Sequence, residues 1–393
     1  MKALKSNRLH IGIFGRTNVG KSSFVNKITG QEVSIVSDIK GTTTDVVEKS
    51  MELLPVGPVT FLDTAGMDDN TVLGTLRGEK TLKALERTDI AVIITDNSEF
   101  GEFETKLAEK SDDLEIPYIT IINKVDNSDS FKTLSDKIIF TSVLYDENLI
   151  YRFKEALVKV LPDYFINTEQ IAGDLVPEKS TVILVVPIDK EAPKGRLILP
   201  QVQTIRDLLD SSCLTYVVKD TELEKALSNL KEPPALVITD SQAFKKVSEI
   251  VPEDIPLTSF SILFARLKGD LRAFINGAKA IDELRDGDKV LILESCTHHA
   301  IEDDIGRVKI PNLLKKKTGK NLVIENYTGH DMPNIVGYSL IIHCGGCMTN
   351  RREILSRINH AEKLNIPITN YGIAISHCLG ILPRAVRILN SSR

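Results

Sequence analysis

The 393-residue sequence has no apolar run long enough to cross a membrane and no excess of basic residues. Its 49 Lys and Arg face 54 Asp and Glu, and the net charge of −5 gives no reason to expect nucleic-acid binding. The first residues, MKALKSNRLHIGIFG, turn polar early and lack the apolar segment of a signal peptide. We therefore expect a cytoplasmic protein with neither a membrane nor a nucleic-acid partner.

Cysteine is also scarce, with five residues in the whole chain, yet three of them fall in two short segments. These segments are CTHH (296–299) and HCGGC (343–347), which also hold three of the seven histidines. In a reducing compartment such a cluster indicates metal or redox chemistry rather than disulfides. We expect the isolated Cys213 to be a buried thiol, and His377 and Cys378 to have packing roles.

Short apolar runs alternate with amphipathic stretches along the whole chain, which predicts an α/β architecture with largely parallel sheets. The length favours two or three domains. We expect a nucleotide-binding domain over 1–167, a small α/β module over 172–264 and a metal-binding α/β domain over 265–393, with a polar, irregular linker at 167–180. The middle module has no constellation of reactive side chains, which makes it a candidate for self-association.

The segment GRTNVGKS (15–22) fits the phosphate-loop pattern G-x-x-x-x-G-K-S between an expected strand and an expected helix. Gly15 and Gly20 let the backbone turn its N–H groups toward phosphate oxygens. Lys21 adds a cation at the β- and γ-phosphates, and Ser22 offers a hydroxyl to Mg²⁺. The helix N-terminus adds a favourable dipole.

Further motifs follow in the order expected of a GTP-binding domain. DTAG (63–66) ends a strand and brings Asp63 toward Mg²⁺, while GTTTD (41–45) supplies a threonine ligand. NKVD (123–126) ends another strand, and its last carboxylate pairs with guanine in a way that adenine does not allow. The residues expected at GTP and Mg²⁺ are Gly15, Arg16, Thr17, Asn18, Val19, Gly20, Lys21, Ser22, Ser23, Thr43, Asp63, Gly66, Asn123, Lys124, Asp126, Ser142 and Val143.

The hydrolytic residues expected within this set are Lys21, Asn18, Thr43 and Gly66. Met67 stands where Ras-like enzymes place the glutamine that orients the attacking water, so hydrolysis must be slow or must obtain charge elsewhere. Asn18 resembles the asparagine that helps to hold potassium in the Era/TrmE-like GTPases. That resemblance implies K⁺ in place of an arginine finger, with a plain turn role for Asn18 as the alternative.

Cys296, Cys344 and Cys347 each follow an expected strand, at the end where ligands of open parallel sheets collect. Together with His298 or His343 they form a Cys₃His set, which fits structural zinc as well as an iron–sulfur cluster. The residues alone leave these two metals equally open.

A GTPase domain, a module without a site, and then C-x-H at 296–298 with H-C-x-x-C at 343–347 resemble the HydF family. These are the GTPase and scaffold proteins of [FeFe]-hydrogenase maturation. The resemblance covers essentially the whole chain. It implies a [4Fe–4S] cluster on Cys296, Cys344 and Cys347, with an exchangeable fourth position for which His298 and His343 are candidates. It also implies a transient di-iron precursor, a homodimer, and contacts with the apo-hydrogenase and two radical-SAM maturases.

Two other hypotheses remain from the sequence. A translation- or tRNA-associated GTPase with a structural zinc module would suit the Era/TrmE resemblance, but not the acidic balance. An electron-transfer iron–sulfur protein gated by GTP would favour four firm ligands rather than three cysteines.

Overall fold

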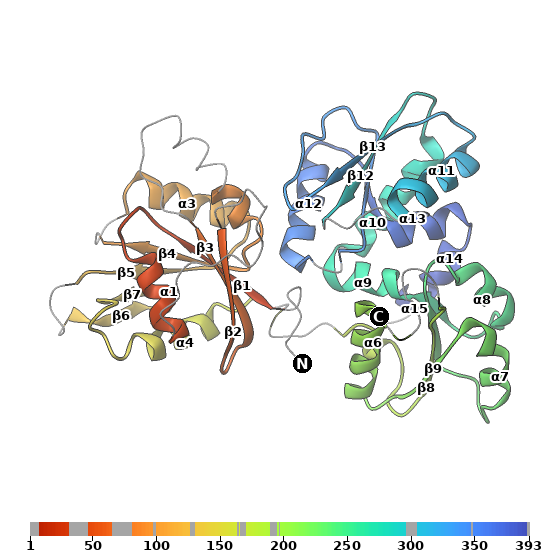
Figure 1. Ribbon diagram of the computed structural model, residues 1–393, viewed down its shortest axis with the longest axis horizontal. Coiled ribbons are helices and arrows are strands. Elements are labelled where there is room, and N and C mark those ends of the chain that lie inside the picture. The colour runs from red at the N-terminus through yellow and green to blue at the C-terminus, as the bar shows by residue number, and fades with distance from the viewer. Residues whose placement is uncertain are drawn as a thin grey trace. The chain divides into compact units, whose positions relative to one another are not determined.

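We describe the protein from a computed structural model. It describes residues 8–30, 46–64, 81–96, 100–125, 130–162, 165, 170–188, 195, 197–295, 305–346 and 349–390. The chain divides into two compact units, Met1–Thr168 and Glu169–Arg393. Figure 1 shows the elements of each unit, which we treat separately.

The first unit is built on a seven-stranded sheet in the order β2-β3-β1-β4-β5-β7-β6. The pairs β2–β3 and β6–β7 are antiparallel and the other pairs are parallel. Its strands are β1 (Leu9–Phe14), β2 (Val46–Leu53), β3 (Gly57–Thr64), β4 (Ile90–Thr95), β5 (Tyr118–Ile122), β6 (Lys132–Ser135) and β7 (Ile138–Phe140), and its helices include α1 (Lys21–Thr29), α3 (Glu102–Asp113) and α4 (Leu149–Lys159).

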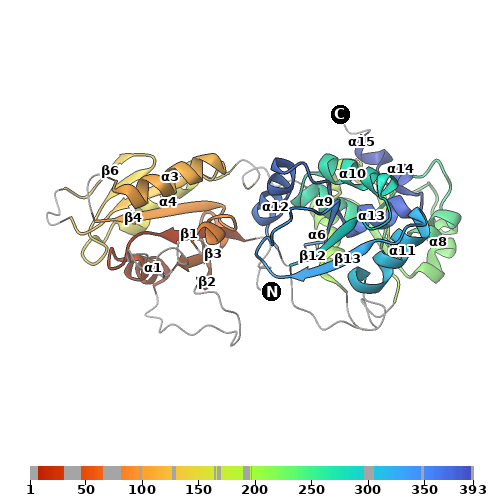
Figure 2. The ribbon, with the colours of Figure 1, turned by 90° about the horizontal axis from the view of Figure 1, so that it is seen from above.

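Helices cover both faces of this sheet, so β1 and β4 are buried along their whole length and are mostly apolar, with His10 buried in β1. On one face, α1 and α4 meet through an edge-to-face pair of Phe24 and Phe153, with ring centroids 5.1 Å apart. Such a pair contributes about 0.5–1.5 kcal/mol beyond the area it buries. Helix α3 packs on the opposite face through Leu107 and Ala108, as Figure 2 shows for α1 and α3.

The second unit holds two four-stranded parallel sheets, in the orders β11-β10-β8-β9 and β13-β12-β14-β15. The elements of the first are β8 (Thr181–Val185), α6 (Leu199–Asp210), β9 (Leu214–Val218), α7 (Leu223–Ser228), β10 (Leu236–Thr239), α8 (Phe244–Ile250), β11 (Leu257–Ser259) and α9 (Phe260–Lys268). The elements of the second are α10 (Leu271–Lys279), β12 (Lys289–Glu294), α11 (Ile310–Thr318), β13 (Val323–Thr328), β14 (Leu340–His343), α12 (Arg351–Lys363), β15 (Ile368–Asn370), α13 (Tyr371–Cys378), α14 (Leu382–Ala385) and α15 (Arg387–Asn390).

Helix α9 lies between these two sheets and joins their cores (Figure 1). Its Phe260 and Leu263 pack into the cluster around β8 and α6, whereas Ile262 and Ala265 pack into a second cluster. That second cluster combines residues of β8 and β10 with residues of β12, β14 and α12. The two sheets of this unit therefore share one continuous apolar interior.

The expected α/β class is confirmed, with a phosphate-loop domain first and two further α/β parts after it. Two details differ from what the sequence patterns indicate. The run 262–284 has the apolar spacing of one continuous helix, but Gly269 ends α9 and Asp270 caps α10 with its side chain. The expected linker is packed in its later part, since Ile171, Ala172 and Val176 are buried.

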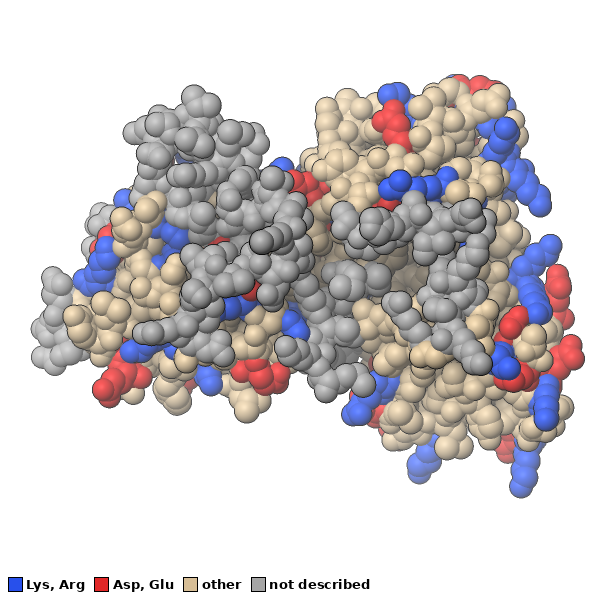
Figure 3. Space-filling view, in the orientation of Figure 1, with Lys and Arg blue, Asp and Glu red and all other residues tan. Residues whose placement is uncertain are grey.

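The surface agrees with the balanced composition. On the face drawn in Figure 3, the described Lys and Arg side chains are interspersed with Asp and Glu rather than gathered into one basic field. None of the helices within the described ranges is both long and apolar enough to cross a bilayer.

The packed segment 171–173 gives a test of this fold. The Asp207 carboxylate accepts N–H bonds from Ile171, Ala172 and Gly173 at 2.8–2.9 Å. Asp207→Ala leaves these donors without their acceptor, and we expect the second unit to lose about 1–3 kcal/mol of stability. Asp210→Ala, which removes an exposed carboxylate of the same helix, is the matched control. Thermal unfolding measures both, and equal midpoints would contradict the anchoring role of Asp207.

Candidate functional site

The phosphate loop runs from the end of β1 to the start of α1. Lys21, the first residue of α1, is buried, and its ammonium group donates to the carbonyl oxygens of Gly15 at 2.9 Å and Arg16 at 2.8 Å. These two bonds hold the Lys21 ammonium group against the backbone of the phosphate loop. Thr17, Asn18, Ser22 and Ser23 are exposed on the same loop and at the helix start.

Asn123, which follows β5, joins the phosphate loop to the segment after β7. Its Nδ2 donates to the Val19 carbonyl at 2.7 Å, and its Oδ1 accepts from the Val143 N–H at 2.9 Å. Gly20 has a φ of 103°, and a Cβ there would lie 2.4 Å from Asn123 Nδ2. The loop therefore needs glycine at position 20, both for its left-handed backbone and for the approach of this amide.

A hydroxyl and a carboxylate of the kind that Mg²⁺ prefers meet beside Lys21. Ser22 Oγ lies 3.3 Å from Asp63 Oδ2 at the end of β3. Burial raises the pKa of the Asp63 carboxyl, whereas Lys21, the Ser22 hydroxyl and Lys49 lower it. The surrounding cations thus offset part of the cost of burying this carboxylate.

Two ion pairs connect Lys124 of the NKVD motif and Arg16 of the phosphate loop to neighbouring acidic residues. Lys124 has a φ of 60° and its ammonium group lies 3.1 Å from Asp96 Oδ2, just beyond β4. Arg16 Nε donates to Glu104 Oε1 of α3 at 2.8 Å, and Glu104 is buried. The sequence analysis missed this buried acid. Ser142 and Val143 follow β7 and are buried.

Several expected residues of the nucleotide site lie outside the described part of the chain. These are Thr43, Gly66, Met67 and Asp126. Of the expected cluster ligands, Cys296, Cys347 and His298 also lie outside it.

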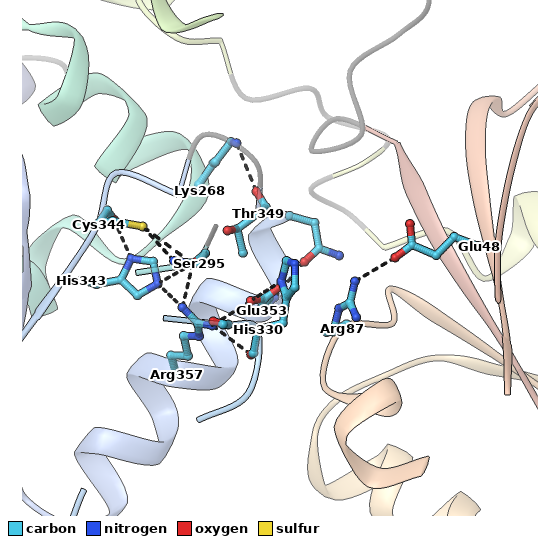
Figure 4. Close-up of polar contacts among 12 residues, drawn as sticks. Glu48, Arg87, Lys268, Ser295, His330, His343, Cys344, Thr349, Glu353 and Arg357 are labelled. Atoms are coloured by element: carbon cyan, nitrogen blue, oxygen red, sulfur yellow. Dashed lines mark hydrogen bonds and ion pairs between the residues drawn. The ribbon is translucent and has the colours of Figure 1, made fainter. Parts of the chain in front are cut away.

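The described part of the cysteine site lies at the carboxyl ends of β12 and β14. Strand β12 is the first strand of its sheet along the chain and has β13 on one side and β14 on the other, so the point between β12 and β14 is the topological switch point of the sheet. The Ser295 N–H points to Cys344 Sγ at 3.4 Å, and the Cys344 N–H donates to the Leu293 carbonyl at 2.9 Å. Ser295, which directly precedes Cys296 in the sequence, thus contacts the first cysteine of the HCGGC segment (Figure 4).

Cys344 has the surroundings of a metal-binding thiolate. Burial opposes ionisation of its thiol, whereas hydrogen bonds from the Gly346 and Ser295 backbone lower its pKa. Gly346 has a φ of 61°, and a Cβ there would lie 2.6 Å from Ile354 Cδ1. The tight loop around this cysteine therefore depends on a glycine at position 346.

The His343 side chain is only 1% exposed, and both of its ring nitrogens have partners. Nδ1 lies 2.5 Å from the Cys344 carbonyl oxygen, and Nε2 lies 2.7 Å from an amino nitrogen of Arg357. A guanidinium only donates, so Nε2 must be the acceptor and Nδ1 must carry the proton.

Two buried cations adjoin the Cys344 loop and were missed by the sequence analysis. Arg357 of α12 forms an ion pair with Glu353 at 2.9 Å, and Lys268 of α9 donates to the carbonyls of Gly346 at 3.0 Å and Thr349 at 3.1 Å. A signal for Arg357 was present in the sequence. It lies between Ile354 and Ile358 on the apolar face of α12, where an unpaired charge would be costly.

The other described cysteines and histidines that the sequence singled out have different partners. Cys213 is buried in the core around β8 and α6, as expected. His377 Nε2 lies 2.8 Å from Asp282, and burial raises the pKa of the Cys378 thiol to about 11. His330 contacts Glu353 at 3.2 Å. Within the described residues, no three His, Cys, Asp or Glu side chains are grouped to hold a metal ion.

Three family models match the chain. The model described as "50S ribosome-binding GTPase" matches residues 10–124. "Hydrogen maturase F dimerization domain" matches residues 171–269, and "Hydrogen maturase F tetramerization domain" matches residues 272–388.

Similarity to curated proteins falls on part of the chain. GTPase Der of Wolinella succinogenes is 37% identical over 140 residues, 34% of this chain and 29% of that protein. The tRNA modification GTPase MnmE of Caldicellulosiruptor saccharolyticus is 34% identical over 155 residues, 38% of this chain and 33% of that protein. The chain thus spans about a third of the length of these relatives.

Among solved structures, Era of Aquifex aeolicus is 19% identical with a TM-score of 0.32, covering 53% of this chain and 93% of that one. The G domain of the T. maritima iron transporter FeoB is 20% identical with a TM-score of 0.30, covering 39% of this chain and 98% of that one.

The phosphate loop, the Ser22–Asp63 pair and the family match define the first unit as a P-loop GTPase domain. The two models that follow it span residues 171–388 almost without a break, and the chain belongs to the hydrogen maturase F family. The translation-associated alternative is not favoured, because residues 171–269 and 272–388 match the hydrogen maturase F models.

The Asn123 bridge gives a test of the nucleotide site. Asn123→Ala removes both bonds between the phosphate loop and the Val143 segment, at a cost of about 1–3 kcal/mol. We expect GTP affinity to fall roughly 5- to 150-fold, measured by titration with a fluorescent GTP analogue. Asn148→Ala, at an exposed position without a side-chain cap bond, should leave the affinity unchanged. Equal affinities of the two variants would show that the bridge does not support binding.

Proposed function

We propose that this protein hydrolyses GTP to GDP and phosphate and acts as a scaffold and carrier in hydrogenase maturation. In this proposal it holds the di-iron precursor of the [FeFe]-hydrogenase active site beside a [4Fe–4S] cluster and passes it to the apo-hydrogenase. The observation that carries the proposal is the contact between the Cys344 thiol and Ser295, the residue before Cys296, in a chain whose residues 171–388 match hydrogen maturase F domains.

The nucleotide half of the proposal rests on what the described residues do. Lys21, held by the loop carbonyls, would meet the phosphates, and Ser22 and Asp63 would hold Mg²⁺. Asn123 ties the phosphate loop to the Val143 segment, which would keep both in place around the nucleotide. Thr43, Gly66 and Asp126 complete the site by their place in the motifs.

The potassium part of the proposal rests on Asn18. Its φ of 63° suits an asparagine as a turn residue, and its side chain is exposed on the phosphate loop. An amide oxygen at this point is a suitable ligand for a monovalent cation beside the phosphates. Such a cation would supply positive charge to the transition state, as an arginine finger does.

The cluster half rests on the fit of the residues present. The Cys344 thiol is held by the Ser295 N–H and lies at the switch point of a parallel sheet. The partial positive charge at the N-terminus of α12, after the Asn350 cap, favours an anionic centre nearby. Cys296, Cys344 and Cys347 would hold the cluster, which when bound supplies one exchangeable coordination position. The sequence offers His298 and His343 for that position, and of these His343 has both ring nitrogens bonded within the protein.

Self-association is supported by the names of both matched domains and by an open edge strand. β9 is the last strand of its sheet, and its Leu214, Tyr216 and Val217 are exposed. Such an edge readily pairs with another chain. We propose a homodimer through residues 172–264, with separate GTP-binding (1–167) and cluster-binding (265–393) regions, and with radical-SAM maturases and the apo-hydrogenase as partners.

Metal analysis tests the cluster proposal. Anaerobic reconstitution of the full chain should give about four iron and four sulfide per chain and a visible absorption band. Cys344→Ser should abolish both, because a serine hydroxyl binds iron far more weakly than a thiolate. Cys213→Ser, at a buried cysteine in another core, is the matched control and should retain the cluster. Lys21→Ala should also retain it while losing GTP. Stoichiometric zinc without iron or sulfide would contradict the scaffold function.

Salt dependence tests the potassium proposal. GTP turnover should be slow in Na⁺ and severalfold faster in K⁺. Asn18→Gly removes the amide and still accepts the positive φ, so it separates cation binding from backbone strain. We expect this variant to turn over GTP equally slowly in both salts. Phosphate release measures the rate. A wild-type rate that is the same in Na⁺ and K⁺ would remove the assignment.

A further inference from the structure

One guanidinium group connects the ends of three adjacent strands around the cysteine site. Arg357 is 2% exposed. One of its amino groups donates to Ser295 Oγ at 2.8 Å, after β12, and contacts His343 Nε2 at 2.7 Å, at the end of β14. The other donates to the carbonyls of Gly329 at 2.8 Å and His330 at 2.9 Å, after β13. Figure 4 shows Arg357 beside Ser295, His330 and His343.

The charge of Arg357 is offset within the same helix. Glu353, one turn earlier, lies 2.9 Å from it, is also buried, and contacts His330 as well. The guanidinium is therefore paired, and four further acceptors fix its direction. A group with this many buried bonds has one arrangement rather than several.

This arrangement decides the state of His343. Its Nε2 accepts a hydrogen bond from the Arg357 guanidinium, and its Nδ1–H donates one to the Cys344 carbonyl. Neither nitrogen has a lone pair left for a metal. The imidazole is thereby held neutral, as the Nδ1–H tautomer, beside the cysteine that it follows.

We infer that Arg357 is a positioning residue of the cysteine site, which holds His343 as a neutral non-ligand and fixes Ser295 against Cys344. Its consequence rests on the proposed cluster function. If the cluster is bound, its fourth coordination position stays open to groups other than His343. The contact itself is independent of that function.

The first experiment uses iron-free protein. With ¹⁵N-labelled histidine, His343 is assigned by the signals that disappear in His343→Ala. We expect one protonated nitrogen, Nδ1, and one acceptor nitrogen, Nε2. A Glu353→Gln/Arg357→Met pair, which removes both buried charges together, should shift the Nε2 signal or change the tautomer. Glu353→Gln alone and Lys363→Met, at an exposed lysine of the same helix, are matched controls that should leave His343 unchanged.

The second experiment uses the reconstituted, reduced protein and pulsed electron spin resonance. Wild type and His343→Ala should have the same nitrogen couplings, because His343 does not bind iron. Glu353→Gln/Arg357→Met should gain a histidine nitrogen coupling that is lost when His343→Ala is added. Arg357→Lys keeps a positive charge but cannot reach all the acceptors, and should give a partial change.

Two results would overturn the inference. One is a wild-type nitrogen coupling that His343→Ala removes, which identifies His343 as a ligand while Arg357 is intact. The other is a protonated Nε2 in the iron-free wild type. Neither result needs the paired substitution to fold. Failure of the cluster function appears separately, as wild-type protein that takes up no iron, while the tautomer measurement still tests the Arg357 contact.

Discussion

Parallel pairing around a central first strand is the constraint on which both sites depend. In the first unit β1 has β3 on one side and β4 on the other, and in the last sheet β12 has β13 on one side and β14 on the other. In each case the chain runs from this strand to one side of the sheet and later continues on the other side. The carboxyl end of the first strand is therefore the topological switch point, where ligands of such sheets bind. The phosphate loop occupies the first such place and the Ser295–Cys344 contact occupies the second.

The two switch points carry different kinds of residues because their expected ligands differ. At the phosphate loop the backbone provides most of the recognition, and glycine at position 20 keeps it accessible. At the cysteine site the recognition is by thiolate, and hydrogen bonds from the Ser295 and Gly346 backbone lower the pKa of the Cys344 thiol. Lys268 of α9 and Arg357 of α12 fix the loop around this thiol, through the Gly346 carbonyl and the His343 ring.

The sequence was sufficient where a residue acts through its own chemistry at a fixed spacing. The phosphate loop, Asp63, Asn123 and the strand before Cys344 all belong to this kind, because strand and motif lie next to each other in the chain. It was insufficient where a contact joins distant segments. Arg357 meets Ser295 across 62 positions and Gly329 across 28, and such a pairing has no local pattern. The break of the helical run at Gly269 was local, but the apolar periodicity continues across it and hid the boundary.

The burial of α9 bears on how the chain can be divided. The matched families meet between residues 269 and 272, directly after α9, and the expected boundary at 264 falls within that helix. Neither position separates two interiors, because Ile262 and Ala265 pack into a cluster that contains residues of both sheets. A fragment that ends at either point would carry an uncovered apolar stripe and would associate through it, whether or not the intact protein does. Self-association of such a fragment would therefore report the cut surface, and oligomeric state is better judged on the undivided unit from Glu169 to Arg393.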